Sequence, residues 1–324
     1  MRVLVASAST ADDRKTLAAV EALGKAGAHV CVGSDSDGAQ SLRSPYCRER
    51  VRYPSPAEDM EGFVAALRDR DDHDVLLPLC DYTTVPVSYF GIERAPVAAY
   101  ESLSLAHDKQ RLLKLAQGIG LDVPETHCPR DLDEVRSLAP SLGYPCVLKP
   151  RMGSAAIGVR YPESAQELVT LYRESGARHD LVFDDRRPLI QAYVPGEVHD
   201  VCALFCRGEP RALLTQHRLL MSPRRGGSGV HNETTWEPEL VEKAVALLRA
   251  LRWHGPAQVE FRGGVLMEVN ARFWGTLELS IRAGINFPLL ACRLVIDGDI
   301  DAIRDYRVGL RQRWSDHRPP VGSR

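Results

Sequence analysis

A stretch near the C-terminal end, LMEVNARFWG at residues 266–275, places ionisable and polar side chains at alternate positions. Glu268, Asn270 and Arg272 are two residues apart, so in a β-strand they point to the same side. Carboxylate and amide oxygens are ligands for a hard cation such as Mg²⁺, and a neighbouring arginine suits phosphate. The spacing therefore suggests metal and phosphate chemistry, although a hairpin with one solvated polar face would show the same pattern.

The register of the preceding hairpin, AQVEFRGGVLMEVN at residues 257–270, decides whether a second acid joins this face. A two-residue turn at Gly263–Gly264 would put Glu260 on the face opposite Glu268. A three-residue loop over 262–264 would pair residue 260 with 266 and residue 258 with 268. Because hydrophobic patterning sets register, we predict the longer loop. It leaves Leu266 as the only apolar exception on a face formed by Gln258, Glu260, Glu268 and Asn270, opposite Val259, Phe261, Val265, Met267 and Val269.

Two lysines stand where they could hold phosphate groups. Lys149 ends the apolar run CVLK and precedes a loop of small residues at 153–158, GSAAIG, whose backbone N–H groups could approach phosphate oxygens. Lys109 opens a helix that Asp108 can cap, so phosphate there would meet an ammonium group and a helix N-terminus. Each feature alone is weak, because a solvated lysine and a flexible loop look the same.

The segment LIQAYVPGEVHD, residues 189–200, is a buried strand that runs into Pro195–Gly196 and then Glu197. A strand-to-loop hinge exposes backbone groups that can bind an adenine ring. A carboxylate just beyond the hinge suits ribose hydroxyls.

The elements that must position these residues follow from periodicity. RVLVA, a helix over about 12–26, AHVCVGS and DVLLPLCD predict a doubly wound parallel sheet within residues 1–105. ASASTADD replaces the glycine-rich fingerprint after the first strand, which argues against a dinucleotide site there. Beyond it we expect a capped helix from 108, three strands over about 188–220, an amphipathic helix in EPELVEKAVALLRALRW and a helical tail.

Composition excludes several classes of protein. The net charge is −2, which disfavours a nucleic-acid or membrane-surface binder, and no apolar run is long enough to span a membrane. The eight cysteines form no CxxC pair and several lie in apolar runs, so we expect free buried thiols in a reducing cytoplasm. The opening MRVLVASAST is interpreted as a strand and its loop, not a signal peptide. The arginine-rich RDYRVGLRQRW is expected to be a solvated helix face.

The order of the motifs HDK, VLKP with its small-residue loop, IQAYVPGE, VEF and MEVNAR resembles the ATP-grasp superfamily over essentially the whole chain. The ending EVNARFWGTLELSIRAGINFPLL is similar to the carboxylate–amine ligase branch, related to the D-alanine–D-alanine ligase and carbamoyl-phosphate synthetase folds. The resemblance implies an α/β fold, in part α+β, in three pieces. These are an N-terminal doubly wound domain (1–105), a central lid subdomain (106–189) and a C-terminal antiparallel-sheet subdomain with the metal site and a helical tail (190–324).

The resemblance also implies a role for each matching residue. ATP would be held by Lys109, Lys149, Gly153, Ser154 and Gly158 at its phosphates, by Gln191, Ala192, Tyr193 and Val194 at adenine, and by Glu197 at ribose. Glu260, Glu268 and Asn270 would bind Mg²⁺, as two ions that Mn²⁺ could replace. Arg272 and Lys149 would stabilise charge during transfer, with Arg218 as a further basic contact. Gln191 and Ala192 depart from the usual acidic hinge, and the loop has fewer glycines than many relatives.

The implied reaction is the ATP-dependent joining of a small carboxylate, an amino acid among the options, to an amine through an acyl phosphate. Two alternatives stay open: transfer of the acyl phosphate to another acceptor, and an ATP-binding regulatory protein without activity. Neither nucleic acid nor membrane is an expected partner, and a homodimer is compatible with the sequence. The segment 222–235, with Arg224 and Arg225, is either a substrate loop or a solvated basic loop. His199 and His217 are interpreted as structural.

Overall fold

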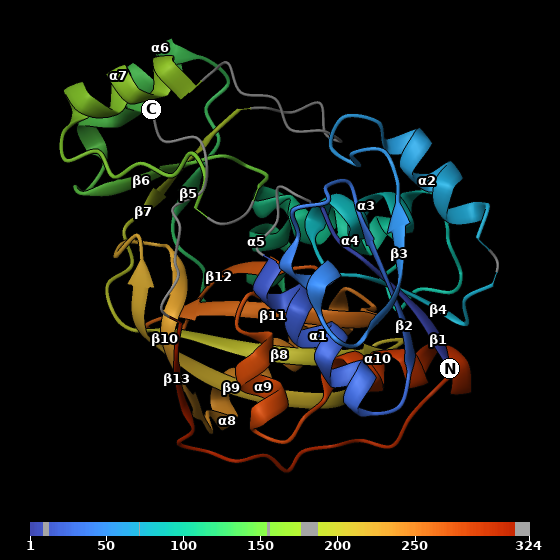
Figure 1. The fold of residues 1–324 in the computed structure, drawn as a ribbon. Coiled ribbons are helices and arrows are strands. Elements are labelled where there is room, and N and C mark those ends of the chain that lie inside the picture. The colour runs from blue at the N-terminus through green and yellow to red at the C-terminus, as the bar shows by residue number, and fades with distance from the viewer. Residues whose placement is uncertain (9–12, 71, 154–155, 176–186, 315–324) are drawn as a thin grey trace.

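The computed structural model describes residues 1–8, 13–70, 72–153, 156–175 and 187–314 (Figure 1). Three sheets carry the fold, and they follow one another along the chain. The mixed α/β class predicted from the sequence is confirmed, with a parallel sheet first and antiparallel sheets after it.

The N-terminal sheet is parallel, in the order β3-β2-β1-β4. Its central strands are short apolar runs buried on both faces, as parallel sheets require. The strands are β1 (Arg2–Ala6), β2 (His29–Ser34), β3 (Cys47–Arg52) and β4 (Val75–Pro78), and the helices are α1 (Asp13–Lys25), α2 (Met60–Arg68) and α3 (Asp81–Tyr89).

Two helices, α4 (Tyr100–His107) and α5 (Lys109–Gly118), lead out of this sheet. Asp108 caps α5 as predicted, because its Oδ1 accepts hydrogen bonds from the backbone N–H groups of Gln110 and Arg111 at 3.1 and 3.2 Å. The capped first turn fixes the position of Lys109.

The central sheet is small and antiparallel, in the order β5-β7-β6. It comprises β5 (Thr126–His127), β6 (Cys146–Lys149) and β7 (Leu189–Ala192), covered by α6 (Leu132–Leu138) and α7 (Ala165–Ser175). The strand expected after the small-residue loop is reduced to a single bridge between Leu148 and Arg160.

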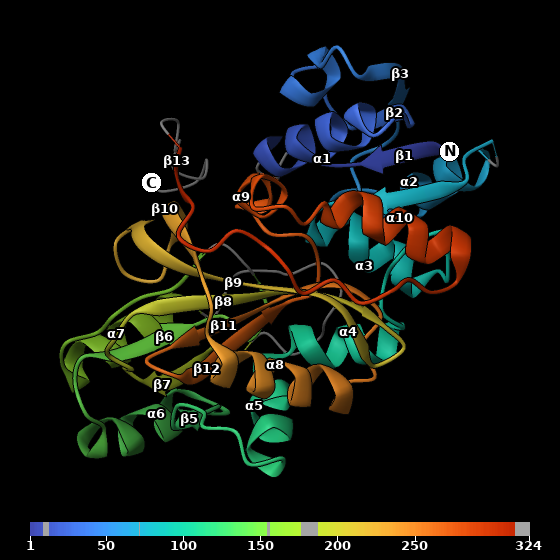
Figure 2. The same ribbon diagram turned by 90° about the horizontal axis from the view of Figure 1, so that it is seen from below.

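The C-terminal sheet has the order β12-β11-β8-β9-β10-β13. Its strands are β8 (Val198–Cys206), β9 (Glu209–Ser222), β10 (Ser228–Thr235), β11 (Gly255–Arg262), β12 (Val265–Asn270) and β13 (Arg311–Arg313), with helices α8 (Pro238–Ala250), α9 (Leu277–Arg282) and α10 (Phe287–Asp297). Helix α8 packs on one face of this sheet. On the other side α9 and α10 lie against α1, and Figure 2 shows them beneath the N-terminal strands. One apolar core therefore joins Val3 and Leu77 to Phe273, Trp274 and Phe287.

Two expectations about the C-terminal part were wrong. Half of the segment expected as a loop, 222–235, is strand β10, which pairs with β9. The arginine-rich tail contains the edge strand β13, paired with β10, in place of a helix. In both segments alternation along a two-sided strand was mistaken for loop or helix character. All eight cysteines are free, and six are buried. Among the described residues, no helix is both long and apolar enough to cross a bilayer.

Candidate active site

The β11–β12 hairpin brings Glu260 and Glu268 directly opposite each other, but by a route that the sequence did not predict. The turn is the two-residue Gly263–Gly264, with both glycines at positive φ (+54° and +81°), so the predicted three-residue loop was wrong. Met267 is then an extra residue, because the pairing steps from 260↔268 to 261↔266. This β-bulge restores the convergence that an uninterrupted two-residue hairpin would have destroyed.

The bulge also exchanges two apolar side chains. Leu266, the exception in the predicted pattern, is fully buried in the core with Val259, Phe261 and Val269. Met267, predicted to lie in that core, instead lines a cavity together with Glu260 and Glu268.

This cavity lies between the central sheet and the C-terminal sheet and collects most of the predicted residues. Its lining includes Lys109, Lys149, Gly153, Gln191, Tyr193, Val194, Glu260 and Glu268. These residues come from α5, β6, the loop after it, β7 and the segment after β7, and the β11–β12 hairpin. Tertiary structure therefore brings together side chains from positions 109 to 268.

Charges within the cavity are closely coupled. Nζ of Lys109 lies 3.5 Å from Oε2 of Glu268 and donates a 2.8 Å hydrogen bond to the carbonyl of Gly153. Burial, followed by the repulsion of Lys109, lowers the pKa of Lys149 to about 8. Burial alone would raise the pKa of Glu268, but the two lysines outweigh it, and the pKa is lowered. Glu268 is therefore ionised at neutral pH, and Lys149 is a buried ammonium group whose charge destabilises the folded state.

Arg218, proposed as a basic contact, does not line the cavity. Its guanidinium forms ion pairs with the carboxylates of Asp200 and Glu260, and Nε donates to Oδ2 of Asp200 at 2.9 Å. Burial would lower the pKa of Arg218, yet Asp200 and Glu260 more than offset it and the pKa is raised. Burial raises the pKa of Glu260, and Arg218 opposes that rise. Arg218 therefore holds the carboxylate of Glu260 in place from outside the cavity and favours its ionised form.

Arg272 and Asn270 also lie just outside the lining. Nε of Arg272 donates to Oδ2 of Asp81, at the start of α3, at 3.0 Å, and Nη2 donates to Oδ1 of Asn270 at 2.9 Å. The amide of Asn270 in turn donates to Oε1 of Gln258 at 3.2 Å. Burial would raise the pKa of Asp81, but Arg272 and His107 lower it well below its usual range. Arg272 therefore links the N-terminal domain to the end of β12.

The opposite end of the cavity has a polar atom suited to a ring amine. Gln191 is 1% exposed, and its Nε2 donates to Oγ1 of Thr126 at 2.8 Å. Oε1 of the same amide is buried and has no hydrogen-bond partner among the described residues. Buried polar atoms normally have partners, so a ligand donor at this position would satisfy it. Val147 and Met267 add apolar surface to the lining.

The small-residue loop contributes Gly153, Ala156 and Ile157 to the lining, while Ser154 and Ala155 lie outside the described residues. Gly158 adopts φ of +78°, and a Cβ there would stand 2.8 Å from Cγ of Pro150. Glycine is therefore required for the return of the loop.

The sequence reasoning missed several cavity residues, among them two with polar side chains. Arg262 is 9% exposed and lines the cavity, and its guanidinium forms no ion pair or hydrogen bond with the described residues. Tyr161 and Met267 line it as well. The signal available for Arg262 was a charged residue beside the turn of a buried hairpin, which was interpreted as part of the loop.

Three predicted hinge and loop residues do not line the cavity: Gly158, Ala192 and Glu197. The carboxylate of Glu197 lies instead beside His217, 3.7 Å from its Nε2. His217 stacks on His199 across the β8–β9 pair. The role of Glu197 at ribose stays a prediction.

Comparisons with known proteins agree with this arrangement. Residues 200–317 match a family described as ATP-grasp in the biosynthetic pathway with Ter operon. The carbamoyl phosphate synthase large chain of Pyrococcus furiosus is 22% identical over 237 residues, which cover 68% of this chain and 21% of that protein. The sequence of residues 200–317 is therefore similar to an ATP-grasp family, which agrees with the order of the motifs.

Solved ATP-grasp structures share the fold. The biotin carboxylase domain of the Hydrogenobacter thermophilus 2-oxoglutarate carboxylase, in complex with MgADP, ADP and bicarbonate, gives a TM-score of 0.75 at 14% identity, over 96% of this chain and 73% of that one. An L-amino acid ligase from Bacillus licheniformis gives 0.69 at 17% identity, over 91% and 74%. At these identities the likeness is one of fold, and it extends over nearly the whole of this chain.

Proposed function

We propose that this protein is an ATP-dependent carboxylate–amine ligase that forms an amide or peptide-like bond and releases ADP and phosphate. The observation that supports it best is the convergence of Lys109, Lys149, Glu260 and Glu268 in one buried cavity. Two ammonium groups suit the phosphates of a nucleotide, and two facing carboxylates suit the metal ions that accompany it.

The proposed reaction has two steps. An oxygen of the substrate carboxylate attacks the γ-phosphorus of ATP, the bond from that phosphorus to the bridging oxygen breaks, and ADP leaves. The amine nitrogen then attacks the acyl carbon of the acyl phosphate, phosphate departs with the carbon–oxygen electron pair, and the amine loses a proton. No side-chain nucleophile is required, since positioning and charge stabilisation supply the catalysis.

The metal ligands are Glu260, Glu268 and Asn270, which would hold two Mg²⁺ ions, with Mn²⁺ as a substitute. The chemistry of this donor set fits, because all three offer oxygen atoms and the lowered pKa of Glu268, which burial opposes and the two lysines cause, keeps it ionised. When bound, Mg²⁺ neutralises phosphate charge as it develops. Arg218 holds Glu260 in place, and Arg272 holds Asn270 while adding positive charge near Glu268.

The nucleotide base is assigned to the Gln191 end of the cavity. The unpartnered Oε1 of Gln191 accepts a hydrogen bond from the exocyclic amine of adenine, and backbone groups of Tyr193 and Val194 read the ring edge. Lys149 and Lys109 hold the phosphates, and the loop from Gly153 to Gly158 covers them. Ala192 contributes only backbone, and Glu197, whose carboxylate lies beside His217, is given no role at the nucleotide.

Hydroxylamine trapping tests this function. Protein, ATP and Mg²⁺ are incubated with hydroxylamine and with pools of amino acids first, then of other small carboxylates, and hydroxamate and ADP are measured. We expect hydroxamate that depends on one carboxylate and is lost in Glu268→Gln, whose circular dichroism stays that of the wild type. Normal ADP formation by Glu268→Gln would refute the metal assignment.

The second substrate separates the ligase from its alternatives. Replacing hydroxylamine with a panel of amines should give one amide product together with stoichiometric phosphate. A hydroxamate without any amide from the panel would favour a non-amine acceptor. Measurable ATP binding with no hydroxamate from any pool would contradict the enzymatic proposal.

A further inference from the structure

Two clusters of metal-binding residue types lie outside the cavity in the described part of the chain. One consists of His29, Cys31 and Glu49, and the other of Glu197, His199 and His217. In each cluster one ligand atom per residue lies within 4.8 Å of the others. The distances do not show which cluster could bind a metal ion, so the hydrogen bonds and ion pairs of each cluster must be compared.

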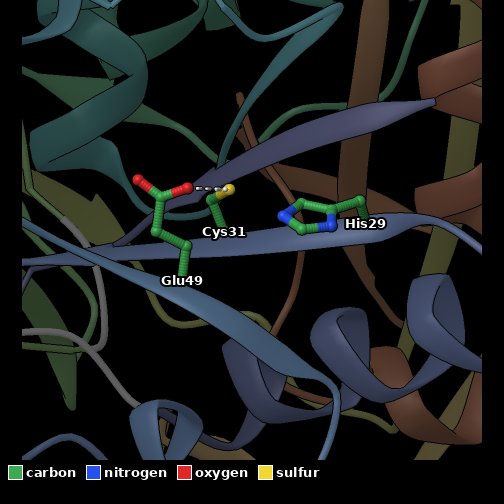
Figure 3. A group of neighbouring side chains, drawn as sticks. All are labelled: His29, Cys31 and Glu49. Carbon is green, nitrogen blue, oxygen red and sulfur yellow. Dashed lines mark hydrogen bonds between the residues drawn. The ribbon is translucent and has the colours of Figure 1, made fainter.

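The first cluster is already internally satisfied. Its members lie on β2 and β3 (Figure 3), where the thiol of Cys31 contacts Oε2 of Glu49 at 3.5 Å. Glu49 also pairs with Arg2 at 2.7 Å and Arg70 at 2.8 Å, so its charge is neutralised. Burial, reinforced by Glu49, raises the pKa of Cys31 to about 12, which disfavours the thiolate that a metal requires. Cys31 and Glu49 are therefore engaged with each other and with the two arginines.

The second cluster is built by strand register. His199 on β8 pairs directly with His217 on β9, so both imidazoles lie on the same face, with ring centroids 4.6 Å apart and planes 16° from parallel. Asp200, Arg218 and Glu260 occupy the opposite face, because Asp200 pairs with residues 216 and 260. The two histidines are thus separated from the nucleotide cavity by the thickness of the sheet.

Two carboxylates complete the second cluster without forming hydrogen bonds to it. Oε2 of Glu197 lies 3.7 Å from Nε2 of His217, and Oε1 of Glu237, which precedes α8, lies 3.7 Å from Nε2 of His199. Both distances are beyond the hydrogen-bond range. The imidazoles are mostly buried, whereas the Glu197 side chain is 71% exposed and free to turn. Two nitrogen donors and the Glu197 oxygen therefore lie within 4.8 Å of one another, and Glu237 adjoins them at His199.

The backbone beneath this point is firmly held. The N–H of Gly263, in the β11–β12 turn, donates to the carbonyl of Glu197 at 3.0 Å. A Cβ on Gly196 would stand 3.0 Å from Cα of Gly263, so the hinge and the turn are in close contact. The histidines themselves stand on two central strands of the sheet. The three donors of the cluster are therefore carried by a fixed backbone.

We propose that Glu197, His199 and His217, with Glu237 as the fourth donor, bind a zinc-class divalent transition metal ion. Imidazole and carboxylate donors favour zinc over magnesium, which prefers oxygen alone. The ligands come from the hinge after β7, from β8, from β9 and from the residue preceding α8. A bound ion would tie the hinge of the nucleotide cavity to the C-terminal sheet and stabilise the folded protein.

Titration of tag-free protein with Zn²⁺ and with Co²⁺, followed by calorimetry and visible absorption, tests this site. We expect one ion per chain, a tetrahedral Co²⁺ spectrum without a thiolate charge-transfer band, and a higher melting temperature with metal. Loss of one ligand in His217→Asn should weaken binding by more than about 100-fold, since even supporting residues contribute about 10–100-fold. His29→Asn, the matched control from the first cluster, should bind as the wild type does.

Unchanged Zn²⁺ affinity in His217→Asn, or no Zn²⁺ binding by the wild type, would overturn the proposal. If His217→Asn does not fold, the wild-type Co²⁺ spectrum decides, because a thiolate band would place the ion on cysteine. The proposed ligase activity is independent of these outcomes, since Glu268→Gln should retain the zinc site and lose ADP formation.

Discussion

Replacing Lys149 with methionine should weaken nucleotide binding and stabilise the folded, ligand-free protein. Lys149 is 7% exposed, and its ammonium group forms no hydrogen bond or ion pair with the described residues. Its burial, together with the repulsion of Lys109, lowers its pKa from 10.5 to about 8 in the folded protein. Methionine matches the length of the apolar stem and removes the charge. The ligand-free protein should therefore become more stable while its affinity for ATP falls.

The size of the effect follows from the pKa. A pKa lowered from 10.5 to about 8 corresponds to about 3 kcal/mol at about 1.36 kcal/mol per pKa unit, and this already includes the attraction of Glu268 and Glu260. Below pH 8 Lys149 is protonated in both folded and unfolded chains, so its buried charge lowers the free energy of unfolding by the full amount. Between pH 8 and 10.5 Lys149 loses its proton in the folded chain and keeps it in the unfolded chain. The destabilisation therefore decreases as the pH rises. Lys149→Met should thus exceed the wild type by about 3 kcal/mol at pH 7 and by about 1 kcal/mol at pH 9.5.

Urea unfolding of both proteins at these two pH values, without nucleotide, measures the difference. Lys114→Met, the same change at an exposed site on α5, should alter stability by less than about 0.5 kcal/mol. Calorimetry with ATP and Mg²⁺ should show about 100-fold weaker binding in Lys149→Met, the equivalent of about 3 kcal/mol. A variant less stable than the wild type at pH 7, or a difference independent of pH, would refute the reasoning about the buried charge.

Three further outcomes test other parts of the site. Lys109→Met should weaken ATP binding less than Lys149→Met, because Lys109 is already held by Gly153 and Glu268, and calorimetry of both variants checks the order. Arg262→Met should weaken ATP binding by about 10-fold without lowering the melting temperature, since its guanidinium faces the cavity without a protein partner; equal affinity would remove it from the site. Asp81→Asn should cost about 3 kcal/mol at pH 7, because it leaves Arg272 buried without its counter-ion. Asp81 has its pKa lowered against the effect of burial, so its contribution is present above its unfolded pKa and is lost as the pH falls. Urea unfolding at pH 7 and at about pH 2, below the unfolded pKa, should therefore show the variant closer to the wild type at the lower pH, and an unchanged gap would contradict the assignment.

Local patterns were sufficient for most of the elements, with β10 and β13 as exceptions, and for most of the charged cavity residues. The cap at Asp108, the strand that ends at Lys149 and the strand that carries Glu268 all depend on short-range preferences, which the sequence expresses directly. The order of these motifs then indicated that distant segments meet. The structure places Lys109, Lys149 and Glu268 in one cavity accordingly.

The register of the hairpin shows where local pattern fails. Alternation assumes one residue per step on both strands, and Met267 breaks that assumption as a bulge. The convergence of Glu260 and Glu268 was predicted correctly from an incorrect pairing. Only the paired backbone decides which apolar residue, Leu266 or Met267, enters the core.

By itself the sequence determined the class of fold, most of the elements and the donor types at the site, because these depend on spacing and side-chain chemistry. Tertiary structure alone decided which charges remain available to a ligand. Arg272 is paired with Asp81, 191 positions away, and Arg218 with Asp200 and Glu260, whereas Lys149 and Arg262 face the cavity. The physical reason is that a buried charge is stabilised by whichever counter-charge the packed elements bring within a few ångströms, and sequence distance carries no information about that.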